Sequence, residues 1–177
     1  WMFYFDKDKW TSERMKALLT GVPQNKMILL DYHCENVELW KRTEHFHDQP
    51  YIWCYLGNFG GNTMIAGNLN DIDFKIKRLF KEGGDNVYGL GATLEGFDVN
   101  PLMYEFVFDQ AWDYPVTTDQ WITNWSMCRG GNQDANIIKA WRALHQKIYT
   151  EHATCGQSVL MNARPRLTGT KSWNTNP

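Results

Sequence analysis

Short apolar runs alternate with amphipathic helix patterns through the first two thirds of this 177-residue chain. The runs at 27–30, 51–56 and 87–92 are apolar or aromatic almost throughout, which is typical of parallel strands covered on both faces. Each run is followed by a helical pattern, at intervals short enough for strand–helix units. If the apolar stretch 1–5 is the remnant of a first strand, strand and helix alternate four times. This alternation predicts consecutive units of an α/β barrel or of a doubly wound sheet.

The helices are predicted from apolar residues spaced three and four positions apart. They are expected over residues 12–22, 37–40, 69–81, 101–112, 119–126 and 134–149. From about Asp113 onward the chain carries only helical patterns, and the tail 155–177 is expected to be irregular. We therefore predict an α/β domain over residues 1–112 and the beginning of an all-α domain over residues 113–177.

Glu95 is the leading candidate for a catalytic residue. It follows a short apolar run that passes through Gly89 and Gly91, where a missing side chain lets backbone or ligand come close. A carboxylate just beyond a strand stands where α/β folds place their active sites, at the carboxyl edge of the sheet. An ordinary solvated glutamate in a strand-to-loop turn is equally compatible with the local pattern.

The composition narrows the class of ligand. A net charge of −2 without a basic run gives no indication of nucleic-acid binding, and no apolar run has the length of a transmembrane helix. Aromatic residues make up 15% of the chain, with nine Trp, and many stand at predicted strand ends. Such rings stack on the apolar faces of sugars, which favours a carbohydrate site. The chain starts without Met inside an apolar stretch, so we expect an internal piece of a longer protein.

In a barrel, the carboxyl ends of the strands meet at one mouth. The residues expected there are Trp1, Tyr32, His33, Asn58, Phe59 and Glu95. They form an aromatic pocket with one carboxylate, whereas glycoside hydrolysis usually requires two. Asp31 and Glu35 are local candidates for the second carboxylate, and a segment before Trp1 is equally able to supply it.

Two other chemistries compete with the sugar site. His33, Cys34, His45 and His47 suggest a metal site, but His45 and His47 are two apart, which suits a shared metal only on a strand. Solvated loop histidines are the favoured interpretation. Cys34 or Cys54 beside His33 suggests a cysteine nucleophile, yet both lie at or within predicted buried strands, where inert packing is favoured.

One long motif resembles a known family. The sequence Pro-Tyr-Ile-Trp-Cys-Tyr-Leu-Gly-Asn-Phe-Gly-Gly-Asn occupies residues 50–62. It is preceded by Trp-Met-Phe at 1–3 and Leu-Leu-Asp at 29–31, and followed by Glu-Gly at 95–96, Asn100 and Tyr104. Together these segments resemble the α-N-acetylglucosaminidases of glycoside hydrolase family 89, through residues 1 to about 112.

The resemblance implies the fold and the reaction. The family has a small N-terminal domain, an eightfold α/β barrel and a large helical domain. The chain would therefore be the last strand–helix units of a (β/α)8 barrel followed by the start of the helical domain. The family removes terminal α-linked N-acetylglucosamine with retention, through a glycosyl-enzyme intermediate. By position, Glu95 matches the nucleophile, and Trp1, Tyr32, Leu56 and Phe59 match residues that line the sugar pocket. Asn58 joins them from its place after a predicted strand.

The resemblance also implies what lies outside this sequence. The acid/base glutamate of the family belongs to an Asn-Glu motif upstream of Trp1, so the chain by itself is expected to be inactive. Its partners would be the glycan and the rest of its parent chain, with a homo-oligomer also compatible, and no cofactor or metal is implied. An extracytoplasmic location is expected, periplasmic or secreted for a bacterial protein and lysosomal for an animal one.

Two other functions are compatible with the sequence. One is a non-catalytic carbohydrate-binding protein with a degenerate barrel, and the other is a hydrolase of non-sugar substrates that uses Cys or His. An Asn-Glu at a strand end upstream of Trp1 would favour the glycosidase over both.

Overall fold

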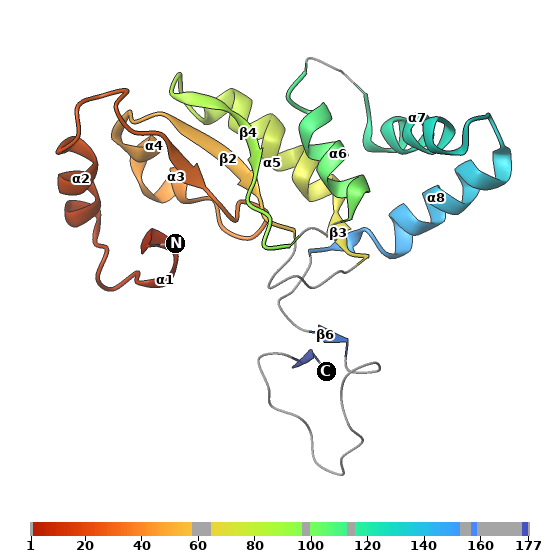
Figure 1. The fold of residues 1–177 in the computed structure, drawn as a ribbon, viewed down its shortest axis with the longest axis horizontal. Helices are drawn as coiled ribbons and strands as arrows, with labels where there is room; N and C mark the ends of the chain where they lie inside the picture. The colour runs from red at the N-terminus through yellow and green to blue at the C-terminus, as the bar shows by residue number, and fades with distance from the viewer. Residues whose placement is uncertain are drawn as a thin grey trace, which may run out of the picture.

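A three-stranded parallel sheet forms the centre of the first part of the chain in the computed structural model, which describes residues 2–57, 65–96, 100–112, 116–152, 157–158 and 175–176 (Figure 1). The strands are β1 (Leu29–Asp31), β2 (Tyr51–Tyr55) and β4 (Val87–Ala92). They lie in the order β1-β2-β4, and both pairings are parallel. The three predicted strands are therefore confirmed as parallel neighbours.

Glycines shape the pairing between β2 and β4. Tyr51 pairs with Val87 and Ile52 with Gly89, so Tyr88 is an extra residue and the register shifts there. Gly89 has a φ of 145°, which a residue with a side chain rarely adopts. At Gly91 an added Cβ would lie 2.8 Å from Cγ2 of Ile52. The close approach expected at the glycines is thus found at Gly91, where β4 packs tightly against β2, whereas an added Cβ at Gly89 would meet no heavy atom within 4 Å.

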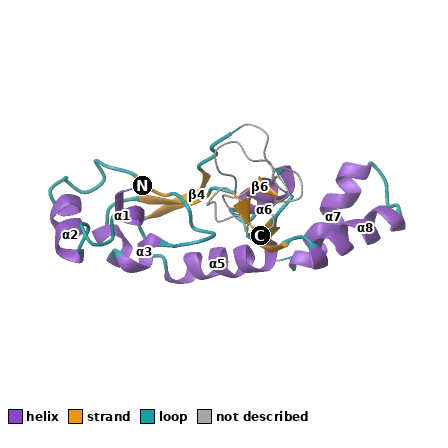
Figure 2. Ribbon diagram, turned by 90° about the horizontal axis from the view of Figure 1, so that it is seen from below, coloured by secondary structure: helices purple, strands orange, loops and turns teal. Residues whose placement is uncertain are grey.

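Helices lie along one side of this sheet (Figure 2). They include α2 (Ser12–Thr20), capped by Thr11, the short α3 (Leu39–Arg42), and α5 (Leu69–Glu82), capped by Asn68. Helix α6 (Pro101–Asp109) follows β4, and begins at Pro101 as predicted. The fully buried core joins the rings of β2 to the apolar stripe of α5, and its members include Tyr51, Trp53, Tyr55, Ile72, Ile76 and Leu79.

The opposite face of the sheet is open in places. Leu30 in β1 is 56% exposed and the neighbouring Ile28 is 55% exposed. In β4, Tyr88 is 57% exposed and no residue is buried. The prediction that these strands are covered on both faces is therefore wrong for β1 and β4 in this structure. The reason is that β1 and β4 are the edge strands of the described sheet, and the helices that pack on the sheet lie on one side of it.

The N-terminal stretch is helical instead of extended. Helix α1 (Met2–Phe5) replaces the predicted strand remnant. Its rings pack locally and against the β1 end, with Phe3 centred 5.2 Å from Trp10 and Tyr4 centred 5.7 Å from Tyr32. A short apolar run does not distinguish helix from strand by periodicity, so neighbouring contacts decide its conformation.

A left-handed turn precedes β2. The helical segment α4 (Glu44–His47) and the following Asp48 have φ values between 49° and 65°. Left-handed conformations are unfavourable for L-residues, so such a run needs support from its surroundings. The support includes the Asn86 side chain, whose Nδ2 donates to the carbonyls of His45 and Gln49 at 2.8 and 2.7 Å.

The second part of the described chain is a pair of helices, α7 (Thr118–Gly130) and α8 (Ala135–Lys147). Helix α7 packs against α6, because Nε1 of Trp121 donates to Asp109 and Nε1 of Trp125 donates to Glu105. The ring of Trp141 meets that of Trp125 edge-on at 4.5 Å. The expected domain boundary near Asp113 lies outside the described residues and stays a prediction.

Two short pairings complete the described chain. Strand β3 (Gly67–Asn68) pairs antiparallel with β5 (Thr150–Glu151), which ties the end of the helical pair to the start of α5. In the tail expected to be irregular, β6 (Gln157–Ser158) pairs with β7 (Thr175–Asn176), and the rest of that tail lies outside the described residues. Among the helices of the described segments, none is long and apolar enough to cross a bilayer.

Candidate active site

Hydrogen bonds join the carboxyl ends of the three parallel strands. The Thr93 amide donates to the carbonyl of Tyr55 at 3.1 Å, and the Thr93 hydroxyl donates to the carbonyl of Tyr32 at 2.5 Å. The residue after β1 and the residues after β4 are thereby fixed to one another beside the end of β2. The sheet thus places three of the predicted site residues, Tyr32, Leu56 and Glu95, at one edge.

Tyr32 and Glu95 interact at this edge. Tyr32 is 5% exposed, and burial raises the pKa of its phenol well above the ordinary value. The charges of Tyr4, Glu95 and Glu35 raise that pKa further. Glu95 itself is partly exposed, two residues beyond Thr93. The edge therefore carries a solvent-accessible carboxylate beside a phenol that stays neutral.

The other predicted pocket residues differ in whether the structure describes them and in how deeply they are buried. Trp1, Asn58 and Phe59 lie outside the described residues, so their place in the pocket stays a prediction. Leu56 is described and fully buried at the end of β2. His33 is also buried, and burial lowers its pKa to about 4, so it is neutral at physiological pH.

Glu35 is held by backbone amides. Its carboxylate is 2% exposed, accepts the Leu56 N–H with both oxygens at 3.1 Å, and accepts the Gly57 N–H at 2.6 Å. Burial raises its pKa to about 7, although these two amide donors act in the opposite direction. A carboxyl group occupied in this way does not stand as the second carboxylate of a glycosidase. Its role in holding Leu56 and Gly57 carries no local signal in the sequence.

Asp31 is likewise a structural carboxylate. It is fully buried, and its Oδ2 accepts the backbone N–H of Trp40 at 3.0 Å. Burial raises its pKa to about 6, against the lowering effect of the Trp40 hydrogen bond. Neither local candidate for the second catalytic carboxylate is therefore placed for that role.

The cysteine and metal alternatives find no support in the geometry. Cys34 and Cys54 are buried, and burial raises the pKa of the Cys34 thiol far above its usual range and that of Cys54 to about 12. Protonated buried thiols are poor nucleophiles. His45 stacks on Trp40 and its Nε2 lies 2.9 Å from the Glu82 carbonyl oxygen. Within the described ranges, no three His, Cys, Asp or Glu residues are grouped as metal ligands.

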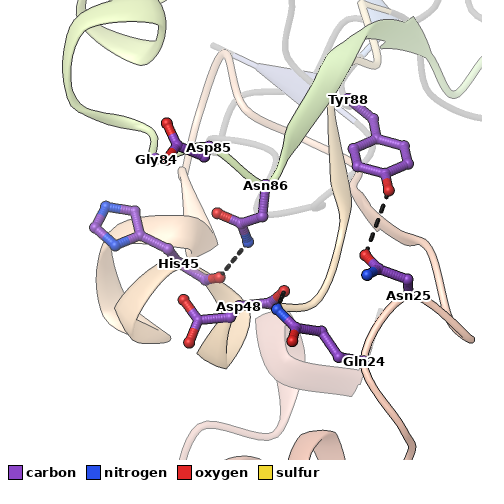
Figure 3. A pocket seen from close by; sticks show the side chains of 8 residues that line it. All are labelled: Gln24, Asn25, His45, Asp48, Gly84, Asp85, Asn86 and Tyr88. Carbon is purple, nitrogen blue, oxygen red and sulfur yellow. Dashed lines mark hydrogen bonds between the residues drawn. The ribbon is translucent and has the colours of Figure 1, made fainter.

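A polar hollow of about 390 Å³ lies at the opposite, amino end of the strands (Figure 3). It is lined by residues that include Gln24, Asn25, His45, Asp48, Asn86 and Tyr88. Several of their polar groups bond to one another, such as Gln24 Nε2 to the Asp48 carbonyl at 3.4 Å and Tyr88 to Asn25 at 3.4 Å. Barrels place their chemistry at the carboxyl ends, so we assign the hollow a structural role.

Two family models match the chain. Residues 1–114 match the α-N-acetylglucosaminidase (NAGLU) tim-barrel domain, and residues 121–177 match the α-N-acetylglucosaminidase (NAGLU) C-terminal domain. The parallel strands and their helices fall within the first match. The predicted fold class, the last units of an α/β barrel followed by helices, is confirmed.

Known proteins align over most of the chain. The human α-N-acetylglucosaminidase is 30% identical over 153 residues, which cover 84% of this chain and 20% of the human protein. A Clostridium perfringens family 89 enzyme, with two glutamates replaced by glutamine and in complex with its substrate GlcNAc-α-1,4-galactose, has a TM-score of 0.77 and 25% identity. The match covers 97% of this chain and 19% of that one.

A second structure of a Clostridium perfringens family 89 glycoside hydrolase, in complex with PUGNAc, has a TM-score of 0.76 and 27% identity. It covers 97% of this chain and 20% of that one. The chain thus spans about a fifth of the length of these relatives.

Proposed function

The chain belongs to the α-N-acetylglucosaminidase family, and from that premise we propose that it supplies the nucleophile of a retaining glycosidase in a full-length protein. The substrate class is a glycan that ends in α-linked N-acetylglucosamine. Glu95 is the proposed nucleophile, and Trp1, Tyr32, Leu56, Asn58 and Phe59 are the proposed sugar-binding residues.

The reaction would take two displacements. The Glu95 carboxylate attacks the anomeric carbon, and the bond from that carbon to the leaving oxygen breaks as an acid donates a proton to that oxygen. In the second displacement, the group that acted as the acid acts as a base and takes a proton from water. The water attacks the anomeric carbon, and the bond between that carbon and Glu95 breaks. The acid/base group is proposed to be a glutamate outside this sequence.

One observation carries the assignment of Glu95. It is a partly exposed carboxylate at the carboxyl end of the sheet, beside Tyr32, whereas Asp31 and Glu35 are buried and bound to backbone amides. Only a carboxylate that reaches substrate can form a covalent intermediate. Among the three candidates raised by the sequence, the geometry therefore favours Glu95.

The substrate class follows from a relative. The Clostridium perfringens enzyme was captured with GlcNAc-α-1,4-galactose, its substrate. We extend to the present chain only the terminal α-linked N-acetylglucosamine. An extracytoplasmic location remains our prediction, and a homo-oligomer is compatible with the sequence.

The test is Glu95→Gln in the full-length protein, assayed on an aryl α-N-acetylglucosaminide. The amide keeps the volume of the side chain but removes the negative charge that attacks the sugar, so turnover should fall by several orders of magnitude while the melting temperature stays unchanged. A solvated glutamate without a catalytic role would leave turnover near that of the wild type, and that result would move the nucleophile elsewhere.

A second variant tests the covalent step. Glu95→Ala leaves space beside the anomeric carbon, so added azide should restore part of the turnover and give a glycosyl azide of inverted configuration. If the wild-type protein binds N-acetylglucosamine but releases no aryl group, the non-catalytic sugar-binding alternative is correct instead.

A further inference from the structure

The peptide unit between Leu56 and Gly57, at the carboxyl end of β2, is clamped from two sides. The Glu35 carboxylate accepts the N–H groups of both residues, at 3.1 and 2.6 Å. The Tyr104 hydroxyl, from α6, donates to the Leu56 carbonyl. Both polar groups of Leu56 and the amide of Gly57 are therefore bonded to side chains from other elements.

Sterics add to this clamp. Gly57 has a φ of 71°, and an added Cβ would lie 2.4 Å from Cε1 of Tyr55 and 2.7 Å from the Tyr104 hydroxyl. The backbone at this point has one close-fitting arrangement, accessible to glycine. The conformation of the backbone at Gly57 is thereby fixed.

Burying the Glu35 carboxylate at this position is unfavourable, because the group loses its hydration. A buried carboxylate is tolerated when hydrogen bonds replace its hydration, and amide donors supply that replacement. His33 Nε2 lies 3.7 Å from its Oε1, and the Lys75 ammonium donates to the Glu35 carbonyl. An apolar residue would fill the same space at less cost but would leave the Leu56 and Gly57 amides without acceptors.

From this geometry we infer that Glu35 is a positioning residue for sugar binding, and that Tyr104 supports it by holding the Leu56 carbonyl. It holds the Leu56–Gly57 peptide unit at the carboxyl end of β2, beside the residues of the proposed sugar pocket, and it takes no part in bond breaking. This inference rests on the proposed function, which places those residues in the sugar pocket. It assigns a role to a carboxylate that the catalytic mechanism leaves unused.

The experiment compares Glu35→Ala, Glu35→Gln and Tyr104→Phe in the full-length protein with the wild type. The measurements are KM and kcat for an aryl α-N-acetylglucosaminide, the inhibition constant of free N-acetylglucosamine, and the melting temperature. We expect Glu35→Ala to raise KM and the inhibition constant about tenfold or more with a smaller change in kcat, because ground-state and transition-state binding fall together.

Conservative replacement should rescue the defect. The Glu35→Gln side chain keeps an oxygen that can accept both amides, so its KM should lie between those of the wild type and Glu35→Ala. Tyr104→Phe should raise KM severalfold, and it tests the same peptide if Glu35→Ala does not fold. Azide should accelerate none of these variants, in contrast to Glu95→Ala.

Glu38→Gln is the matched control for loss of a buried carboxylate. Glu38 is 8% exposed, and it binds Nε1 of Trp40 and of Trp53, away from the β2 end. We expect it to lower the melting temperature while KM stays at the wild-type value. If Glu35→Ala and Tyr104→Phe lower the melting temperature and leave KM unchanged, as Glu38→Gln does, the positioning role is wrong.

The two hypotheses fail in different ways. If Glu95→Gln turns over the substrate as fast as the wild type does, Glu95 is not the nucleophile. The KM comparison would still decide the role of Glu35. If the wild type binds sugar without cleaving it, the dissociation constant of N-acetylglucosamine replaces KM in the same comparison. A full-length protein that neither cleaves nor binds this sugar would overturn both.

Discussion

The two ends of the parallel sheet use hydrogen bonds in different ways. At the carboxyl end, the buried Glu35 and Tyr104 side chains fix the backbone of Leu56, and the partly buried Thr93 hydroxyl fixes that of Tyr32. At the amino end, the groups around the hollow are largely exposed amides and hydroxyls bonded across the surface (Figure 3).

This difference shows where the backbone position is most closely determined. A buried hydrogen bond is costly to lose, because the remaining partner has no water to replace it, whereas an exposed one is readily exchanged for water. The carboxyl end is therefore closely specified at Leu56 and Tyr32. The amino end is specified mainly where the left-handed turn at 44–48 must be supported.

The largest effect is expected for Gly57→Ala at the carboxyl end. The new Cβ would overlap Tyr55 and Tyr104 at a positive φ, so we expect a loss of at least about 2 kcal/mol in unfolding free energy and a tenfold or greater fall in kcat/KM. Gly131→Ala is the control. Gly131 has a φ of 69° with no heavy atom within 4 Å of an added Cβ, so it should lose only about 1 kcal/mol and leave kcat/KM unchanged. Equal effects of the two variants would contradict the clamp.

Asn86→Ala should give the largest effect at the amino end. It removes two hydrogen bonds that hold the left-handed turn, to the carbonyls of His45 and Gln49, so we expect a loss of about 1–2 kcal/mol. Denaturant unfolding and steady-state kinetics on the same samples would measure it. A change in KM for the aryl glycoside would give the hollow a part in catalysis and break the contrast between the two ends.

The pH dependence of stability should identify Glu35. Its pKa is raised from 4.5 to about 7 on folding, so between these values the folded state binds more protons than the unfolded state. Stability should therefore fall as pH rises through this window, by about 1 kcal/mol per pH unit from this group. Glu35→Gln should remove that component. Subtracting the curve of stability against pH of this variant from that of the wild type cancels the similar contribution of Asp31. It also cancels the opposite contribution of His33, whose pKa is lowered from 6.5 to about 4 on folding, so that its contribution to stability rises with pH. A flat difference across the window would show that Glu35 is ionised throughout.

The smallest effect is expected for Gln24→Ala. Its side chain bonds the Asp48 carbonyl at 3.4 Å in an exposed position, which water can replace. Unfolding free energy should stay within about 0.5 kcal/mol of the wild type, with unchanged kinetics. A loss as large as that of Asn86→Ala would mean that the whole rim of the hollow supports the turn.

The sequence by itself determined the features that depend on local pattern. The apolar runs predicted the three parallel strands, apolar spacing predicted the helices that begin at Ser12 and Pro101, and Glu95 was recognisable as a carboxylate just beyond a glycine-containing strand. These signals lie within a few residues of the features they predict, because backbone preference and side-chain periodicity act over that range.

Tertiary structure decided the rest. Glu35 lies 21 positions before Leu56 in the sequence, and Tyr104 lies 48 positions after Leu56. No local pattern could therefore show that both side chains hold the same peptide unit. The same holds for α1, whose rings pack on other segments, and for the left-handed turn supported by Asn86. Asp31 and Glu35 resemble Glu95 in sequence as acidic residues after strands. They differ from it because burial and amide donors, which only the folded chain provides, determine which carboxylate remains accessible to a substrate.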